Sequence, residues 1–241
     1  MTTRPLSQKT KRQIEKCLAE YDEKRHLLEH LSKSLFSLFS EHKLLNPYIH
    51  SVKFRVKERS HLQDKLERKA RKAREQKEIF TIFPENLLED IEDLVGVRIL
   101  HLHTEQIKDI DLALRQIFSE QRYTIKEGPV ANTWDIEYED YFKSLGFQTS
   151  SRTSLYTSVH YIIQVSNDLK AEVQVRTLQE EVWGEVSHKI NYPAQIQSIA
   201  CQEQIKVLAR VTSSGTRLVD SIFKSLDEFT ETREMKNKRK D

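Results

Sequence analysis

The chain has 241 residues, which is long enough for one sizeable mixed domain with additional helices and a core of its own. Hydrophobic residues make up 37% and charged residues 32%, with only five glycines and five prolines, and this composition excludes disordered and fibrous proteins. Cys17 and Cys201 lack a metal-ligand spacing, so neither a zinc site nor a disulfide framework is predicted. No stretch approaches the roughly 18 apolar residues of a membrane span, and we expect a cytoplasmic protein without a membrane partner.

The net charge of +2 hides an uneven distribution of charge. Residues 52–77 carry eleven lysines and arginines against four acids. Such a segment attracts anions, although a run of charge is more often a solvated helix face. We interpret residues 68–77 as solvated surface and keep the earlier cations of the segment as candidates for an anion site.

Apolar periodicity and turn residues predict an α/β core between two helical regions. The predicted elements are, in chain order, a helix over 11–40, a strand at 52–57, a basic helix at 61–78, a short helix at 85–92, a strand at 95–102, a helix at 106–120, a strand at 122–126, strands at 158–165 and 171–176, a helix at 177–189 and a last helical region at 203–230. We expect a hairpin through Asn167-Asp168 and an irregular excursion over 128–154. The expected regions are 1–47 (helical), 48–193 (mixed domain) and 194–241 (helical extension and charged tail).

Two strands of the expected core carry polar side chains. In strand 171–176, the side-chain period of two places Glu172, Gln174 and Arg176 on one face. A half-solvated hairpin would show the same pattern. Asp93 stands just before the buried strand at 95–102, from which Arg98 would project, although a turn carboxylate is an equally good interpretation.

Transfer of a phosphoryl or pyrophosphoryl group needs carboxylates that hold Mg²⁺ and cations that neutralise phosphate charge. Asp93 and Glu172 could supply the carboxylates. Arg55, Lys57 and Lys65 could converge on a triphosphate, because the first two share a strand face and the third lies in the first turns of the next helix.

Together these segments resemble the synthetase domain of the RelA/SpoT-type alarmone synthetases, small stand-alone members included, over roughly residues 48–193. The resemblance rests on an ordered set of motifs: RVK with a later lysine (Arg55, Lys57, Lys65), DxxGxR (Asp93, Gly96, Arg98), YxSxH (Tyr156, Ser158, His160), ExQxRT (Glu172, Gln174, Arg176, Thr177) and WxExxHKxxY (Trp183, Glu185, His188, Lys189, Tyr192). It implies a mixed β-sheet flanked by helices, related to nucleotidyltransferases.

The resemblance also implies an activity: transfer of the β,γ-pyrophosphate of ATP to the 3′ hydroxyl of GDP or GTP, under Mg²⁺. In the roles it implies, Arg55 and Arg98 flank the adenine of ATP, Lys57 and Lys65 bind its phosphates, and Asp93 with Glu172 holds Mg²⁺. Glu172 also helps to deprotonate the acceptor hydroxyl. Tyr156 stacks on the acceptor guanine, and His160, Gln174 and Arg176 lie near its phosphates. We interpret Trp183, His188 and Tyr192 as packing and support.

Two departures from the family pattern concern the substrates. The family commonly has Gly before the stacking Tyr and often Arg after it, whereas Leu155 and Thr157 stand here, and a Ser common between Lys57 and Lys65 is replaced by His61. The acceptor therefore stays open between GMP, GDP, GTP, an adenosine nucleotide and a tRNA 3′ end. A tRNA-modifying, toxin-like relative and a non-enzymatic nucleotide- or RNA-binding module are the alternatives to the synthetase.

The long members of the family add a hydrolase domain marked by a His-Asp pair, and this sequence contains no such pair. We therefore expect synthesis without hydrolysis. In small relatives the flanking helices build oligomers, and helices 11–40 and 203–230 could build a homo-oligomer here. It is equally consistent with the pattern that they pack on their own core.

Overall fold

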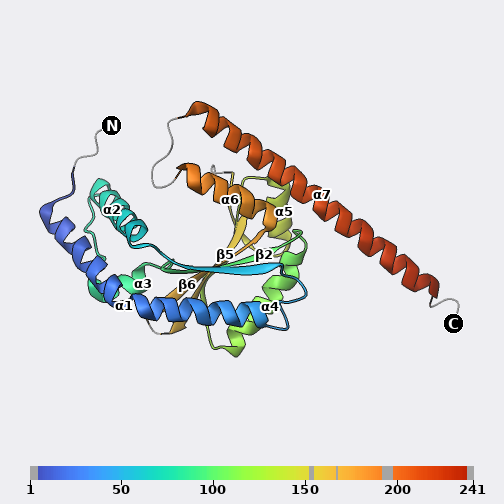
Figure 1. The fold of residues 1–241 in the computed structure, drawn as a ribbon, viewed down its shortest axis with the longest axis horizontal. Helices are drawn as coiled ribbons and strands as arrows, with labels where there is room; N and C mark the ends of the chain where they lie inside the picture. Colours follow the sequence, from blue (N-terminus) through green and yellow to red (C-terminus); the bar gives the residue numbers. More distant parts are fainter. Residues whose placement is uncertain (1–4, 152–154, 167, 192–197, 238–241) are drawn as a thin grey trace.

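The computed structural model describes residues 5–151, 155–166, 168–191 and 198–237. Its elements are α1 (Gln8–Glu41), β1 (Ser51–Val56), α2 (Arg59–Glu75), η1 (Pro84–Asn86), α3 (Leu87–Asp90), β2 (Val95–His101), α4 (Gln106–Glu120), β3 (Thr124–Thr133), α5 (Ile136–Ser144), β4 (Gln148–Ser151), β5 (Ser158–Ser166), β6 (Leu169–Thr177), α6 (Leu178–Asn191) and α7 (Ile199–Asn237). The strands form one mixed sheet in the order β1-β2-β6-β5-β3-β4, with β2–β6 and β3–β4 parallel. The predicted fold class, a mixed sheet flanked by helices, is confirmed (Figure 1).

One face of the sheet is apolar because alternate residues of its strands are aliphatic. Val97, Ile99, Val173 and Val175 are buried, and the helices α1 and α4 cover this face (Figure 1). The rings of Phe39 and Phe118 join those two helices, with centroids 6.2 Å apart, and edge-to-face contacts of this kind stabilise a core beyond their buried area. Since its apolar residues belong to the same core as the sheet, α1 packs on its own chain.

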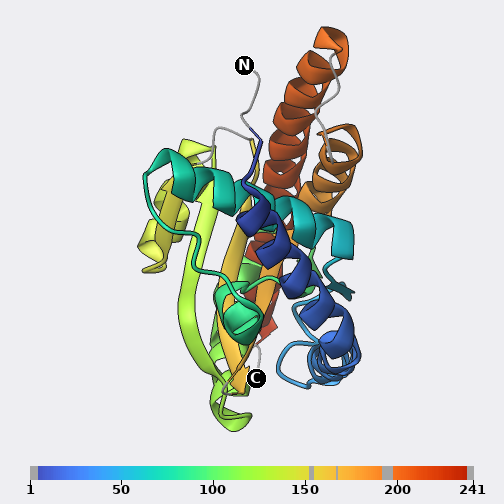
Figure 2. The ribbon, with the colours of Figure 1, turned by 90° about the vertical axis from the view of Figure 1, so that its left-hand side faces the viewer.

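The two helices that flank β1 in sequence lie side by side (Figure 2). The hydroxyl of Tyr21 in α1 donates to the backbone carbonyl of Lys57, directly after β1. Leu62 and Leu66 of α2 are fully buried, while the rest of α2 is mostly charged, as its sequence predicts. This contact with α1 therefore holds the backbone between the end of β1 and the start of α2.

The prediction of an irregular excursion over 128–154 is wrong for the residues that the structure describes. β3 continues to Thr133, α5 follows, and β4 pairs with β3. The strand lacks a clean period of two because its register against β5 shifts twice, between Ile125 and Glu127 and between Glu127 and Val130. The expected hairpin of β5 and β6 is confirmed, although Asn167 in its turn, like 152–154, lies outside the described residues.

Polar contacts fasten α7 to the body. The carboxylate of Asp135 caps α5 and also accepts hydrogen bonds from Ser213, at 2.7 Å, and Arg217. Asp220 accepts from the backbone N–H of Thr104 at 2.6 Å. The large apolar residues exposed on α7 are Ile199, Val207, Val211, Leu218, Ile222, Leu226, Phe229 and Met235. A homo-oligomer built through the terminal helices stays a prediction.

No helix among the described residues is both long enough and apolar enough to cross a membrane.

The anchoring of α7 can be tested by comparing two helix caps. Asp135→Ala should lower the free energy of unfolding by about 2–3 kcal/mol, because it removes a cap and the buried acceptor of two α7 donors. Ser7→Ala removes the exposed cap of α1 and should cost about 1 kcal/mol or less. Urea unfolding of both variants is the measurement, and equal losses would mean that Asp135 acts as a cap alone.

Candidate active site

The second face of the sheet is polar, and the strand register aligns its side chains in rows. One row contains Arg55, Gly96 and Glu172, which are paired across β1, β2 and β6. The next row contains Lys53, Arg98, Gln174 and His160, from β1, β2, β6 and β5. Residues two apart on a strand share a face, so both rows point to the same side. Five of the predicted site residues thus come from four adjacent strands, and a sixth, Arg176, lies one step further along β6.

Gly96 makes room for Arg55. A Cβ built at Gly96 would lie 3.3 Å from Nε and 3.4 Å from Cγ of Arg55, so the arginine side chain lies across this backbone position. The space that a side chain would fill at this glycine is therefore taken by a side chain of the neighbouring strand.

Asp93 lies between two lysines. Its two carboxylate oxygens accept from Nζ of Lys57 at 3.0 Å and from Nζ of Lys65 at 2.8 Å. Burial alone would raise the pKa of Asp93, but the two ammonium groups outweigh it and hold that pKa below its usual value. Burial lowers the pKa of Lys57 despite the attraction of Asp93. The structure thus brings the predicted phosphate-binding lysines onto a predicted metal ligand.

Glu172 is held in a similar way by His160 and Gln174. Its carboxylate oxygens lie 3.1 Å from Nδ1 of His160 and 2.8 Å from Nε2 of Gln174. Burial raises the pKa of Glu172, but the contact with His160 outweighs it, so the net shift is downward. Glu172, Asp93, His160 and Lys65 all line one cavity of about 200 Å³.

The two carboxylates fit a magnesium ion. Oxygen ligands are the ones that Mg²⁺ prefers, and proteins often supply only one or two of them while water and phosphate oxygens complete the octahedron. Among the described residues, no group of three or more histidine, cysteine or acidic side chains could hold a metal ion. Asp93 and Glu172 are thus a carboxylate pair of the kind that can hold Mg²⁺ together with water and phosphate oxygens.

Tyr156 lies inside the polar cluster. Its hydroxyl lies 3.2 Å from Nε2 of His160 and 3.5 Å from both Oε1 of Gln174 and Nη1 of Arg176. The guanidinium carbon of Arg176 lies 5.7 Å from the centroid of the Tyr156 ring, and the ring of Trp183 lies 6.3 Å away. The structure thus brings the four predicted acceptor-side residues together.

Leu155 has a φ of 54°, in the left-handed region that glycine adopts without strain. This is the position where the family commonly has glycine. Leu155 packs against the small apolar cluster of Trp183, Ile205 and Ala209, between α6 and α7. The backbone conformation that the family's glycine would favour is therefore present here with a leucine side chain.

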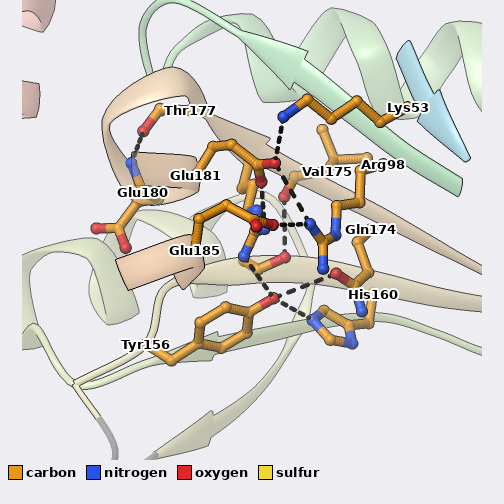
Figure 3. Close-up of polar contacts among 12 residues, drawn as sticks. Lys53, Arg98, Tyr156, His160, Gln174, Val175, Thr177, Glu180, Glu181 and Glu185 are labelled. Atoms are coloured by element: carbon orange, nitrogen blue, oxygen red, sulfur yellow. Dashed lines mark hydrogen bonds and ion pairs between the residues drawn. The ribbon is translucent and has the colours of Figure 1, made fainter. Parts of the chain in front are cut away.

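The sequence predicts no site role for three members of the polar face, of which Glu185 stands in the WxExxHKxxY motif. Lys53, Glu181 and Glu185 form ion pairs with one another or with Arg98 and Arg176, as Figure 3 shows. The sequence does contain a sign of this role, because Glu181 and Glu185 lie four residues apart on the helix directly after a strand that carries arginine. Charges on a short helix also resemble solvated surface, so this spacing by itself does not identify a site.

The supporting residues have mixed outcomes. Trp183 is buried and donates from Nε1 to the carbonyl of Ile205 at 3.1 Å, as its packing role predicts. The ring of His188 lies 6.1 Å from that of His61, between α6 and α2. Tyr192 lies outside the described residues.

Glu180 points away from this cluster (Figure 3). It lines a cavity of about 20 Å³, to which Arg176 also contributes. Burial raises the pKa of Glu180 to about 8, with a contribution from Asp135, although Arg176 opposes it. His101 lines the same cavity, and burial lowers its pKa to about 4. Both groups are therefore neutral near pH 7.

The chain thus forms a mixed sheet with one apolar face and a second face on which carboxylates alternate with cations. The model of the region found in RelA / SpoT proteins matches residues 54–197. The chain therefore belongs to this family.

Solved structures show the same fold. A GTP pyrophosphokinase family protein from Streptococcus pneumoniae has 18% identity and a TM-score of 0.57, over 92% of this chain and 97% of that one. Small alarmone synthetase 1 from Bacillus subtilis bound to its product pppGpp has 19% identity and a TM-score of 0.52, over 83% and 93%. The same synthetase bound to AMPCPP has 19% identity and a TM-score of 0.50, over 89% and 98%. No curated protein matches the chain.

The buried glutamate outside the cluster predicts a pH dependence of stability. The pKa of Glu180 is about 8 in the folded protein and about 4.5 when exposed, so between these values the folded state binds more protons and the free energy of unfolding falls as pH rises. The slope from this group is at most about 1.4 kcal/mol per pH unit. Glu180→Gln should remove it.

Urea unfolding of the wild type and Glu180→Gln at pH 5 and pH 8 tests this. The stability of the variant relative to the wild type should increase with pH. Glu203→Gln, which changes an exposed glutamate of α7, should follow the wild type at both values. Parallel pH profiles for Glu180→Gln and the wild type would show that Glu180 is ionised in the folded protein.

Proposed function

We propose that the protein is an ATP-dependent pyrophosphokinase that transfers the β,γ-pyrophosphate of ATP to the 3′ hydroxyl of GDP or GTP and so makes (p)ppGpp. The observation that carries this proposal is the shared cavity of Asp93 and Glu172, with Lys57 and Lys65 on the first carboxylate and His160 on the second. Family membership supports it, as do similar structures that contain pppGpp and AMPCPP.

The donor side is the cavity wall around Asp93. Asp93 and Glu172 would hold Mg²⁺, which would neutralise charge on the ATP phosphates as the reaction proceeds. Lys57 and Lys65 each have further N–H donors beyond the one given to Asp93, so they can bind phosphate oxygens from their present positions. Arg55 and Arg98 would flank the adenine, since planar guanidinium groups stack on purines.

The acceptor side is the group around Tyr156. The tyrosine would stack on the guanine, with Gln174, His160 and Arg176 near its phosphates. In the transfer, the 3′ oxygen forms a bond to the β phosphorus of ATP, the bond from that phosphorus to the α,β-bridging oxygen breaks, and AMP leaves. Glu172 accepts the hydroxyl proton, because its lowered pKa keeps the carboxylate ionised at neutral pH.

A second candidate is a tRNA-modifying or adenosine-modifying relative, favoured by Leu155 and Thr157 beside the stacking residue. Basic α2 would then face RNA, but two of its arginines are engaged within the chain: Arg71 with Glu67 at 2.8 Å and Arg74 with the carbonyl of Pro5 at 3.0 Å. The compact acceptor group favours a mononucleotide.

Incubation of the purified protein with γ-labelled ATP and Mg²⁺, against GMP, GDP, GTP, ATP and deacylated tRNA, tests the function. We expect labelled product with GDP and GTP. Label on tRNA alone, with binding that weakens steeply as salt is added, would replace the first candidate with the second. Nucleotide binding without any labelled product would indicate a non-enzymatic module.

Loss of either carboxylate should abolish transfer. Asp93→Asn and Glu172→Gln remove charge and little volume, so the circular dichroism spectrum should stay unchanged while the rate falls more than tenfold, a loss above about 1.4 kcal/mol of transition-state stabilisation. Glu89→Gln, an exposed carboxylate four residues before Asp93, is the control and should keep the wild-type rate. A variant that retains more than a tenth of the rate has not lost a metal ligand.

The acceptor assignment depends on the ring of Tyr156. Tyr156→Ala should raise the acceptor KM by an amount consistent with about 1–3 kcal/mol of stacking, and leave the KM for ATP nearly unchanged. Tyr156→Phe should be mild, because it keeps the ring and loses only the long contacts of the hydroxyl. Steady-state kinetics with each substrate varied in turn distinguishes the two effects, and a larger change for ATP would place Tyr156 on the donor side.

A further inference from the structure

One carboxylate connects three strands of the polar face. Glu181 of α6 accepts from Nζ of Lys53 at 2.9 Å, from Nη1 of Arg98 at 3.3 Å and from Nη2 of Arg176 (Figure 3). These cations come from β1, β2 and β6. The side chains of Glu181 and Arg176 are only 6% and 3% exposed, so this pair lies largely out of water, where charge-assisted hydrogen bonds are strong and directional, whereas Lys53 is half exposed.

The close approach of α6 to the sheet makes this geometry specific. A Cβ built at Gly184, one turn after Glu181, would lie 2.6 Å from Nη1 of Arg176. The guanidinium of Arg176 is therefore confined by the helix backbone, by the carboxylate of Glu181 and by the nearby ring of Tyr156. Such confinement leaves Arg176 few alternative rotamers.

Glu185 differs from Glu181 in reach and exposure. Its side chain is 49% exposed and it pairs with Nη1 of Arg98. The two carboxylates hold Arg98 by the N–H edge of its guanidinium, which leaves the flat face of the group available for a base. Nε of Arg98 and Nε of Arg176 are buried and have no hydrogen-bond partner among the described residues.

We propose that Glu181 is a positioning residue that serves both substrates, holding Arg98 for the donor nucleotide and Arg176 for the acceptor, whereas Glu185 serves the donor alone. This inference rests on the proposed function, because it takes nucleotides as the ligands of the two arginines. It adds to that function one residue, Glu181, that connects the arginine of the donor side with the arginine of the acceptor side.

Three glutamates of α6 provide a matched experiment: Glu181→Gln, Glu185→Gln and, as control, Glu180→Gln. Glu180 is as buried as Glu181 but lines the small cavity that also contains His101. We expect Glu181→Gln to raise the KM of ATP and of the acceptor, each about tenfold. Glu185→Gln should raise the KM of ATP alone, and Glu180→Gln should change neither at pH 7.

A double-mutant cycle separates positioning from general destabilisation. If Glu181 acts on ATP through Arg98, then Glu181→Gln should weaken ATP binding less than about twofold once Arg98→Ala is present. Additive losses would overturn the proposal, as would an effect of Glu181→Gln on one substrate only. If Glu181→Gln does not fold, Glu181→Asp keeps the charge on a shorter side chain, and unchanged KM values in that variant would also overturn it.

Calorimetric titration with ATP and with GDP keeps this test independent of turnover. If no acceptor yields product, the proposed function fails, but the effects of the three variants on the affinities for the two nucleotides are still measurable. If Glu181→Gln is then the only one of the three variants that weakens the binding of both nucleotides, the positioning role is supported in a protein that binds nucleotides without transferring pyrophosphate.

Discussion

The polar face of the sheet depends on one constraint: a charge that is partly buried must be paired. Removing an ion from water costs several kcal/mol, and only an opposite charge with good hydrogen bonds offsets this. Lys57 and Asp93 are paired with each other, and Glu181 is paired with cations from three strands. Helix α6 brings Glu181 to its cations on the strands, and helix α2 brings a second lysine, Lys65, to Asp93.

In the proposed function, the same pairing would prepare the face for anionic ligands. A lysine that is already held by a carboxylate loses little side-chain freedom when a phosphate arrives, so less entropy opposes binding. The carboxylates also limit the positive field of the face, because each of them compensates a cation until a ligand is present. A divalent cation would then compensate the negative charge of the carboxylates, and the lysines would donate their remaining N–H groups to phosphate oxygens.

The sequence predicted the parts of the fold in which one residue pattern determines one structure. The hairpin of β5 and β6 follows from two alternating segments, and the shared face of Glu172 and Gln174 follows from the period of a strand. The strand predicted at 122–126 corresponds to the start of β3, whereas the rest of β3 and all of β4 were not predicted, because register shifts interrupt the alternation of β3. The contacts of Glu181 could not be predicted from local pattern, since they depend on how closely α6 approaches the sheet, which Gly184 permits.

Leu155 shows how a departure from the family pattern can be compatible with the same site. A left-handed conformation costs a non-glycine residue about 1–2 kcal/mol. Burial of a leucine side chain can contribute about 1.5–3 kcal/mol when complete, and Leu155 is partly buried against Trp183, Ile205 and Ala209. The two terms are of similar size, so packing between α6 and α7 can offset the strain. A glycine would adopt the left-handed conformation before Tyr156 without strain, whereas here the contacts of the Leu155 side chain stabilise it. Tyr156 lies beside His160 in this arrangement.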